Sequence, residues 1–220
     1  MTTFPGSPRV LKGGIVLIDP LSGQLLPNGV IVLQYNADTL SRTLKIKGME
    51  EGADRSEALR LKGPPVETIK LDAEIDATDQ LEFPDQNQST VQNGISPQLA
   101  AIELLVYPTS TQLQSNFNLV QQGTLEIVPM ETPLTLFVWS ANRILPVRLT
   151  DFSVTEEAFD PTLNPIRAKV SLGMRVLTID DVNFADKAGS LYMVYQRQKE
   201  ALAQLNQFGT LGALGIRGIP

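Results

Sequence analysis

The stretch VETIKLDAEID, residues 66–76, alternates between apolar and charged side chains over most of its length. The apolar positions are Ile69, Leu71, Ala73 and Ile75, and the charged positions are Lys70, Asp72, Glu74 and Asp76. Because successive side chains of a strand point to opposite faces of a sheet, this pattern predicts a strand with one buried and one solvent-facing side. The stretch IRAKVSLGMRV, residues 166–176, repeats the pattern, and its polar face is basic, with Arg167, Lys169 and Arg175.

Short apolar segments elsewhere predict a mainly β chain. Further strands are expected over residues 14–18, 30–35, 42–47, 125–128, 134–139 and 145–155, and the strand that begins at 166 is expected to run to 179. In 145–155 the apolar positions change parity between Leu149 and Phe152, which predicts a β-bulge. Gly23 and the sequence Pro27–Asn28–Gly29 predict turns, and residues 48–65, 83–95 and 156–165 are expected to be loops.

Two helices are expected. The first begins with Ser96 as its cap and Pro97 in its first turn, has apolar residues at helical spacing, and stops before Pro108. The second covers residues 191–205, with an apolar side formed by Leu191, Val194, Tyr195, Ala201, Leu202 and Leu205. We therefore expect a β domain with one flanking helix over residues 1–184, followed over 185–220 by an amphipathic helix and an extended, glycine-rich tail.

Composition excludes several kinds of chemistry. The 220 residues include no histidine and no cysteine, which rules out Ser-His-Asp triads, Cys-His pairs and ordinary zinc sites. A net charge of −6 argues against binding to nucleic acid through phosphate contacts. No apolar run approaches the about 18 residues of a membrane helix, and residues 1–14 lack the apolar centre of a secretion signal. We expect a cytoplasmic protein with no cofactor and no direct membrane insertion.

Two acidic clusters remain as candidate sites. Glu156, Glu157 and Asp160 offer carboxylates for general acid–base chemistry, but no partner of suitable type lies at a recognisable spacing, which favours a solvated connection whose Asp caps a turn. Asp72, Glu74 and Asp76 share a strand face, which suits an acidic groove, a Ca²⁺ site or an ordinary wet surface. No EF-hand pattern of glycine and terminal glutamate accompanies them.

The basic strand face and the tail have structural alternatives. Arg167, Lys169 and Arg175 could bind phosphate, but the chain has no glycine-rich phosphate loop, so the alternatives are a solvated face or a contact with the acidic face of another copy. The tail GTLGALGIRGIP, residues 209–220, carries Leu211, Leu214 and Ile216. It is either inert or docks on a neighbouring subunit, where burial of those side chains would offset the cost of ordering.

Four segments in series resemble a known family. They are YNADTLSRTL (35–44), GPPVETIKLDAEID (63–76), GISPQLAAIELLVYP (94–108) and LFVWSANRILPVRLTDFSVTEEAFDPTLNPIRAKVSLGMRVL (136–177). They are similar to the tube-like domain of contractile injection system baseplate proteins, and in particular to the adaptor between spike hub and inner tube in phage-tail-like particles. Relatives often carry a LysM module after this domain, whereas here a helix and tail follow, so peptidoglycan binding is not expected.

The resemblance implies a β-barrel or β-sandwich of the phage tail-tube type and a sixfold ring in which strands of each subunit join one inner barrel. It also implies that the loops 48–65 and 156–165 make contacts within and between rings, and that the partners are spike or hub and inner-tube proteins of the same particle. Assembly in the cytoplasm within the particle and no catalytic residues are expected as well. Our first hypothesis is therefore a structural hexamer, not an enzyme. The alternatives are a stand-alone carbohydrate- or lipid-binding β-sandwich and, last, a carboxylate-dependent hydrolase.

Overall fold

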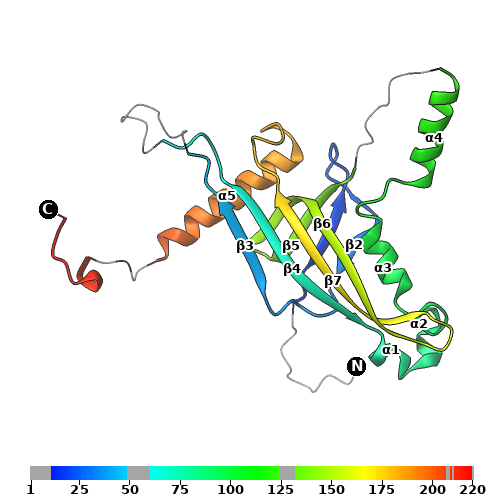
Figure 1. Ribbon diagram of the computed structural model, residues 1–220. Helices are drawn as coiled ribbons and strands as arrows, with labels where there is room; N and C mark the ends of the chain where they lie inside the picture. The colour runs from blue at the N-terminus through cyan, green and yellow to red at the C-terminus, as the bar shows by residue number, and fades with distance from the viewer. Residues whose placement is uncertain (1–10, 49–59, 124–131, 207–208, 210, 220) are drawn as a thin grey trace.

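One seven-stranded antiparallel sheet forms the centre of the protein (Figure 1). The computed structural model describes residues 11–48, 60–123, 132–206, 209 and 211–219. The strands lie in the order β2-β1-β5-β6-β7-β4-β3. Their bounds are β1 Gly14–Ile18, β2 Leu25–Val32, β3 Leu40–Lys45, β4 Val66–Asp76, β5 Leu134–Ser140, β6 Arg143–Phe159 and β7 Pro165–Val176. The prediction of a mainly β chain is confirmed, whereas the strand expected over 125–128 lies outside the described residues.

The two alternating stretches form β4 and β7, which are neighbours in the sheet. Their apolar positions are buried, including Ile69 and Leu71 on β4 and Val170 and Leu172 on β7. β4 has the predicted bounds, and β7 ends at Val176, three residues earlier than expected. The parity of the sequence therefore identifies the buried face of both strands correctly.

β6 is longer than predicted. The expected loop over 156–165 is wrong, because β6 continues to Phe159 and β7 begins at Pro165, which leaves a tight turn between them. The predicted bulge is confirmed, since the pairing of β6 with β7 shifts register between Leu149 and Asp151. β6 and β7 thus form a long hairpin whose pairing is interrupted by register shifts.

Of the two turns predicted near the first hairpin, the one at Gly23 is confirmed. The turn lies between β1 and β2, where Gly23 has φ +70° and the Asp19 carboxylate accepts hydrogen bonds from the backbone and hydroxyl of Ser22. The turn expected at Pro27–Asn28–Gly29 is wrong, because these residues lie within β2. Asn28 has φ +56° there, opposite a register shift in β1, so its turn-forming residues make a bulge inside the strand.

Between β4 and β5 the structure has more helix than predicted. The helices are α1 Thr78–Leu81, the 3₁₀ helix η2 Pro84–Gln86, α2 Gln88–Asn93, α3 Ser96–Glu103 and α4 Ser110–Gln121. The single flanking helix and the loop over 83–95 are therefore wrong. Ser96 lies inside the first turn of α3 and Ile95 precedes it, and α3 ends at Glu103 without reaching Pro108. Thr109 and Gln112 form a reciprocal capping box that starts α4.

The C-terminal helix α5, Lys187–Gln204, packs its first half on the sheet. Tyr192 and Tyr195 belong to the main apolar core with Ile69 and Val170. The predicted apolar side is wrong in part, because Val194, Leu202 and Leu205 are exposed. Figure 1 shows the reason, since the second half of α5 extends past the edge of the sheet.

The tail beyond α5 contains a short 3₁₀ helix, η3, Leu211–Leu214. It was predicted to be extended, and its apolar side chains Leu211, Leu214 and Ile216 are exposed. None of the helices described here combines the length and the apolar character that crossing a bilayer requires.

Candidate interaction surface

The acidic and basic strand faces lie side by side in the same chain. The antiparallel register of β4 and β7 places Glu74 opposite Lys169 and Asp76 opposite Arg167. Asp72 lies opposite Ser171 on the same face. Cross-strand neighbours of opposite charge stabilise a sheet, so the two polar patterns in the sequence are two halves of one mixed-charge surface.

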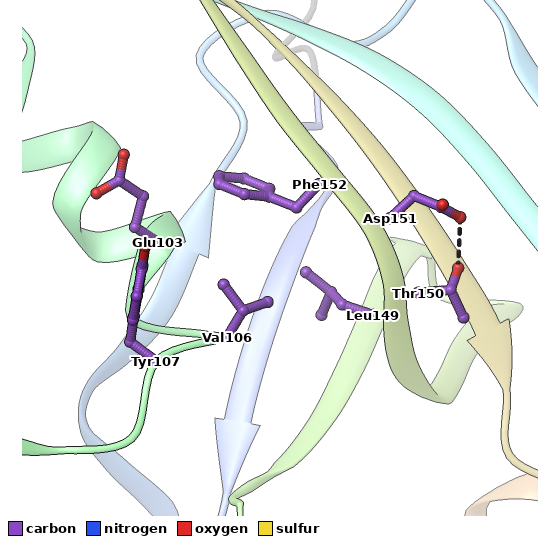
Figure 2. Close-up of a pocket in the computed structure, with 7 residues that line it drawn as sticks. All are labelled: Glu103, Val106, Tyr107, Leu149, Thr150, Asp151 and Phe152. Carbon is purple, nitrogen blue, oxygen red and sulfur yellow. Dashed lines mark hydrogen bonds between the residues drawn. The ribbon is translucent and has the colours of Figure 1, made fainter. Parts of the chain in front are cut away.

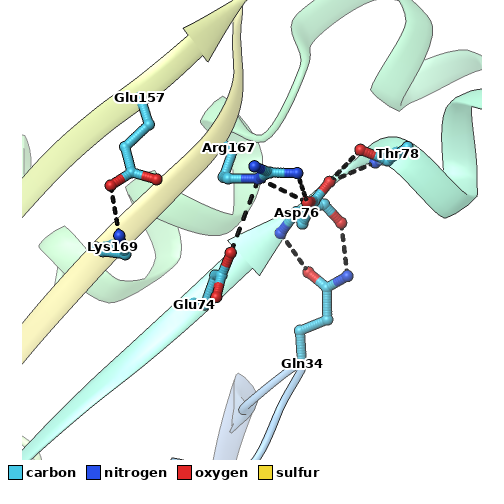
Figure 3. A network of polar contacts seen from close by, with 7 residues as sticks. All are labelled: Gln34, Glu74, Asp76, Thr78, Glu157, Arg167 and Lys169. Carbon is cyan, nitrogen blue, oxygen red and sulfur yellow. Dashed lines mark hydrogen bonds and ion pairs between the residues drawn. The ribbon is translucent and has the colours of Figure 1, made fainter.

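Direct ion pairs join this surface (Figure 3). Arg167 lies 2.7 Å from the Asp76 carboxylate and 3.7 Å from that of Glu74. Lys169 reaches across to Glu157 on β6 at 2.7 Å. A hydrogen bond from Arg167 to Asp76 raises the pKa of Arg167, and one to Glu157 raises the pKa of Lys169. The basic strand therefore finds acidic partners within its own chain, and a role for these residues between subunits stays a prediction.

Arg175 lies at the other end of β7, apart from this group. Its guanidinium is 2.5 Å from Asp181, in the segment that leads to α5. Arg167 and Lys169 thus belong to one group of ion pairs, and Arg175 belongs to another.

Asp76 also anchors a link between distant parts of the sheet. The side-chain amide of Gln34, just after β2, donates to the Asp76 carbonyl at 2.5 Å and accepts from the Asp76 backbone N–H at 2.9 Å. Partial burial opposes ionisation of the Asp76 carboxyl, but hydrogen bonds from Thr78 and then from Arg167 outweigh it and lower its pKa. Figure 3 shows these contacts meeting at the end of β4.

Asp160 holds the β6–β7 turn. Its carboxylate accepts hydrogen bonds from the side chains and backbone N–H groups of Asn164 and Thr162, which lower its pKa to about 2. Glu157 forms an ion pair with Lys169 on the solvent-facing side of the sheet. Glu156 pairs with Ala168, a buried residue of the core face. The three acids therefore do not converge on one point, and within the described ranges no group of His, Cys, Asp or Glu is placed to hold a metal ion.

A pocket of about 400 Å³ opens between the end of α3 and β6 (Figure 2). Glu103, Val106 and Tyr107 line it from the helix side, and Leu149 to Phe152 line it from the strand. Figure 2 shows Asp151 turned away from Glu103, toward Thr150, to which it is hydrogen-bonded at 2.9 Å. A glycosidase-type mechanism needs two carboxyl groups facing one substrate bond, and these two do not face each other.

A buried ion pair fastens α5 to the sheet, and the sequence analysis missed it. Glu67 on β4 has a side chain only 4% exposed and lies 2.6 Å from Arg42 on β3, whose side chain is 27% exposed. Arg42 also donates to the Tyr195 hydroxyl at 3.0 Å, and Lys199 lies 3.9 Å from Glu67. Burial, then the Glu67 charge, raises the pKa of Tyr195, and burial lowers that of Lys199. The contacts of Tyr195 and Lys199 mark where α5 crosses β3 and β4.

Several strand edges stay unpaired among the residues that the structure describes, and one of them is β2, which pairs only with β1. β3 pairs only with β4. β6 pairs with β5 only over residues 143–147, so residues 148–159 have β7 on one side and no strand on the other. Unpaired edges present rows of backbone donors and acceptors that another chain can pair with. We call β3 and residues 148–159 of β6 the two free edges.

No known protein-family model matches the chain, and no curated protein sequence matches it. Its function is therefore argued from the geometry of the sheet and its edges.

Proposed function

We propose that the protein is a structural component of a contractile injection system baseplate. Six copies form a ring that adapts the spike hub to the inner tube, and the strands β3, β4, β7 and β6 of each copy join one continuous inner barrel. The action is mechanical, because the ring continues a wall around an axial channel. The two free edges, on opposite sides of these four strands, are the observation that carries the proposal.

The strand directions support such joining. Each of the pairs β3–β4, β4–β7 and β7–β6 is antiparallel. β3 and β6 therefore run in opposite directions, and β6 of one copy meets β3 of the next as an antiparallel pair. A contact between two different surfaces of identical copies is heterologous, and such contacts generate a closed ring when the rotation between copies closes. Ring closure also removes free edges that would otherwise promote aggregation.

The two faces of these strands suit a channel wall. Lys70, Asp72, Glu74, Lys169 and Ser171 share the solvent-facing side with both signs of charge. The opposite side packs on a core that also contains Ile15 of β1 and Phe137 of β5. This common core between β5-β1-β2 and the four-stranded half supports a β-sandwich of the tail-tube type, with its polar side toward the channel.

The test is the oligomeric state of the purified chain over a wide concentration range. Native mass spectrometry and particle averaging are expected to show a sixfold ring, and amide exchange of Leu40–Lys45 is expected to slow as the ring forms. Leu44→Lys places a charge at the exposed edge strand β3 and should abolish the ring while the fold remains. Val91→Lys, on the exposed side of α2, is the matched control. A chain that remains monomeric up to the highest attainable concentration, with freely exchanging β3 amides, would overturn the proposal.

A further inference from the structure

α4 projects from the body of the protein with no partner among the described residues (Figure 1). None of its residues is buried. Leu113, Phe117 and Val120 lie at helical spacing and are 51%, 57% and 56% exposed. A 12-residue helix is marginally stable by itself in water, even with the capping box that α4 has. An apolar stripe on such a helix indicates a surface that is covered in the functional state.

The outer half of α5 projects in the same way. Beyond Lys199, the last residue that contacts Glu67, the exposed residues include Leu202 and Leu205, at 49% and 70%. Figure 1 shows this half of α5 and α4 at opposite ends of the molecule, with the sheet between them. The molecule therefore has exposed apolar side chains on two helical segments, one at each end.

The sheet register connects α5 with the segment that leads into α4. Leu149 pairs with Met174, Met174 with Ile69, and Ile69 with Arg42, so these four residues form one row across the sheet. Met174 and Ile69 are fully buried, which identifies the row as lying on the core face. At one end of the row Arg42 bonds to Tyr195 of α5. At the other end Leu149 contacts the same pocket as Val106 and Tyr107, which lead into α4.

We propose that α4 of one copy packs its stripe of Leu113, Phe117 and Val120 on Leu202 and Leu205 of α5 in the next copy. This inference rests on the proposed ring. When the free edge of β6 meets β3 of the next copy, the row of side chains continues from one copy into the other. The segment that leads into α4, which lines a pocket with Leu149 of β6, and α5, which is bonded to Arg42 of β3, then arrive at one junction.

The lack of charge on α4 is compatible with a second copy as the occupant. Each copy carries a net charge of −6, and an uncharged contact surface adds no like-charge pairs to the repulsion between copies. Residues 104–123, which include all of α4, contain no charged residue. Depletion of charge together with apolar anchors is typical of the buried centre of a protein interface. A contact between α4 helices of two copies would be twofold and would not continue around a ring.

Disulfide trapping tests this contact, because the chain has no cysteine of its own. Phe117→Cys protein is mixed with Leu202→Cys protein under mild oxidation, and the products are separated by mass. We expect the mixed disulfide to exceed both homodimers severalfold. The control replaces Leu202→Cys with Phe83→Cys, an equally exposed site at the far end of the molecule near α1. No enrichment over this control, or a predominant Phe117→Cys homodimer, overturns the inference.

A second variant separates this inference from the proposed ring. Phe117→Ser should weaken ring association by about tenfold, as removal of a central aromatic anchor does, while Phe83→Ser leaves it unchanged. Sixfold rings that form normally with Phe117→Ser refute the α4–α5 contact and leave the ring proposal standing. Absence of both rings and mixed disulfide refutes both. Trapping that requires another particle protein identifies that protein as the occupant and also refutes contact with a second copy.

Discussion

Removal of Glu67 is expected to be among the most damaging single changes on β4. Glu67→Ala deletes the partner of Arg42, which it contacts at 2.6 Å, and the nearby charge for Lys199 at 3.9 Å. Removing one member of a buried ion pair costs about 3 to 5 kcal/mol, because the remaining charge is left without compensation. Arg42 is 27% exposed and regains some water, so we expect the low end, about 3 kcal/mol.

The conservative change Glu67→Gln separates charge from shape. The amide keeps an acceptor for Arg42 but loses the negative charge, and a charge-assisted hydrogen bond is about twice as strong as a neutral one. We therefore expect a loss of about 1 to 1.5 kcal/mol, well below the alanine variant. A larger loss of stability for Glu67→Ala than for Glu67→Gln would show that Glu67 acts both through its charge and by filling the contact.

Urea unfolding followed by circular dichroism measures these changes as free energies of unfolding. Glu74→Ala is the matched control, because it removes the same chemical group from the same strand on the solvent-facing side. Its partner Arg167 lies 3.7 Å away, and the expected change is within about 0.5 kcal/mol. If Glu67→Ala costs less than about 1 kcal/mol, the ion pair does not hold α5 on the sheet as argued.

Two further predictions concern the β6–β7 hairpin. Asp160 has a pKa of about 2 in the folded chain against an ordinary 3.8, so its stabilising effect is present above about pH 4 and is lost as the pH falls toward 2. Asp160→Asn should therefore lower the unfolding midpoint at pH 6, and the difference from the unmodified chain should shrink at pH 3. A difference that does not depend on pH would count against the turn contacts of Asp160 with Asn164 and Thr162. Gly94→Ala should destabilise the folded chain by more than about 1 kcal/mol, because Gly94 has φ +57° and an added Cβ would lie 2.1 Å from the Pro165 carbonyl oxygen. Gly123→Ala is the control for the backbone part of that cost, since Gly123 has φ +82° and open space around it. Equal losses of stability in the two variants would refute the steric part.

The sequence alone determined which residues of the long strands are buried. In 66–76 and 166–176 apolar and polar residues alternate, and every second side chain of a strand points to the same face. The apolar set, which includes Ile69 and Val170, is therefore predicted to be buried without knowledge of the partner strand, and both residues are buried. The bulge near Leu149 followed from the same rule, because a change of parity within a strand requires an extra residue. α4 was also within reach, since Thr109 and Gln112 have the spacing of a capping box.

Only the tertiary structure decided which strands are neighbours and which edges stay free. The pairing of Glu74 with Lys169 joins residues far apart in the chain. The alternation fixes the face on which each residue lies, but it does not say which strand is the neighbour. The side of α5 that is buried depends on where the helix crosses the sheet, which is why Tyr192 is covered and Leu202 is not. The edge of β3 is free because β3 is terminal in the strand order, and that of β6 is free beyond residue 147 because β5 pairs only with its first part. Both are properties of the whole sheet that no single segment encodes.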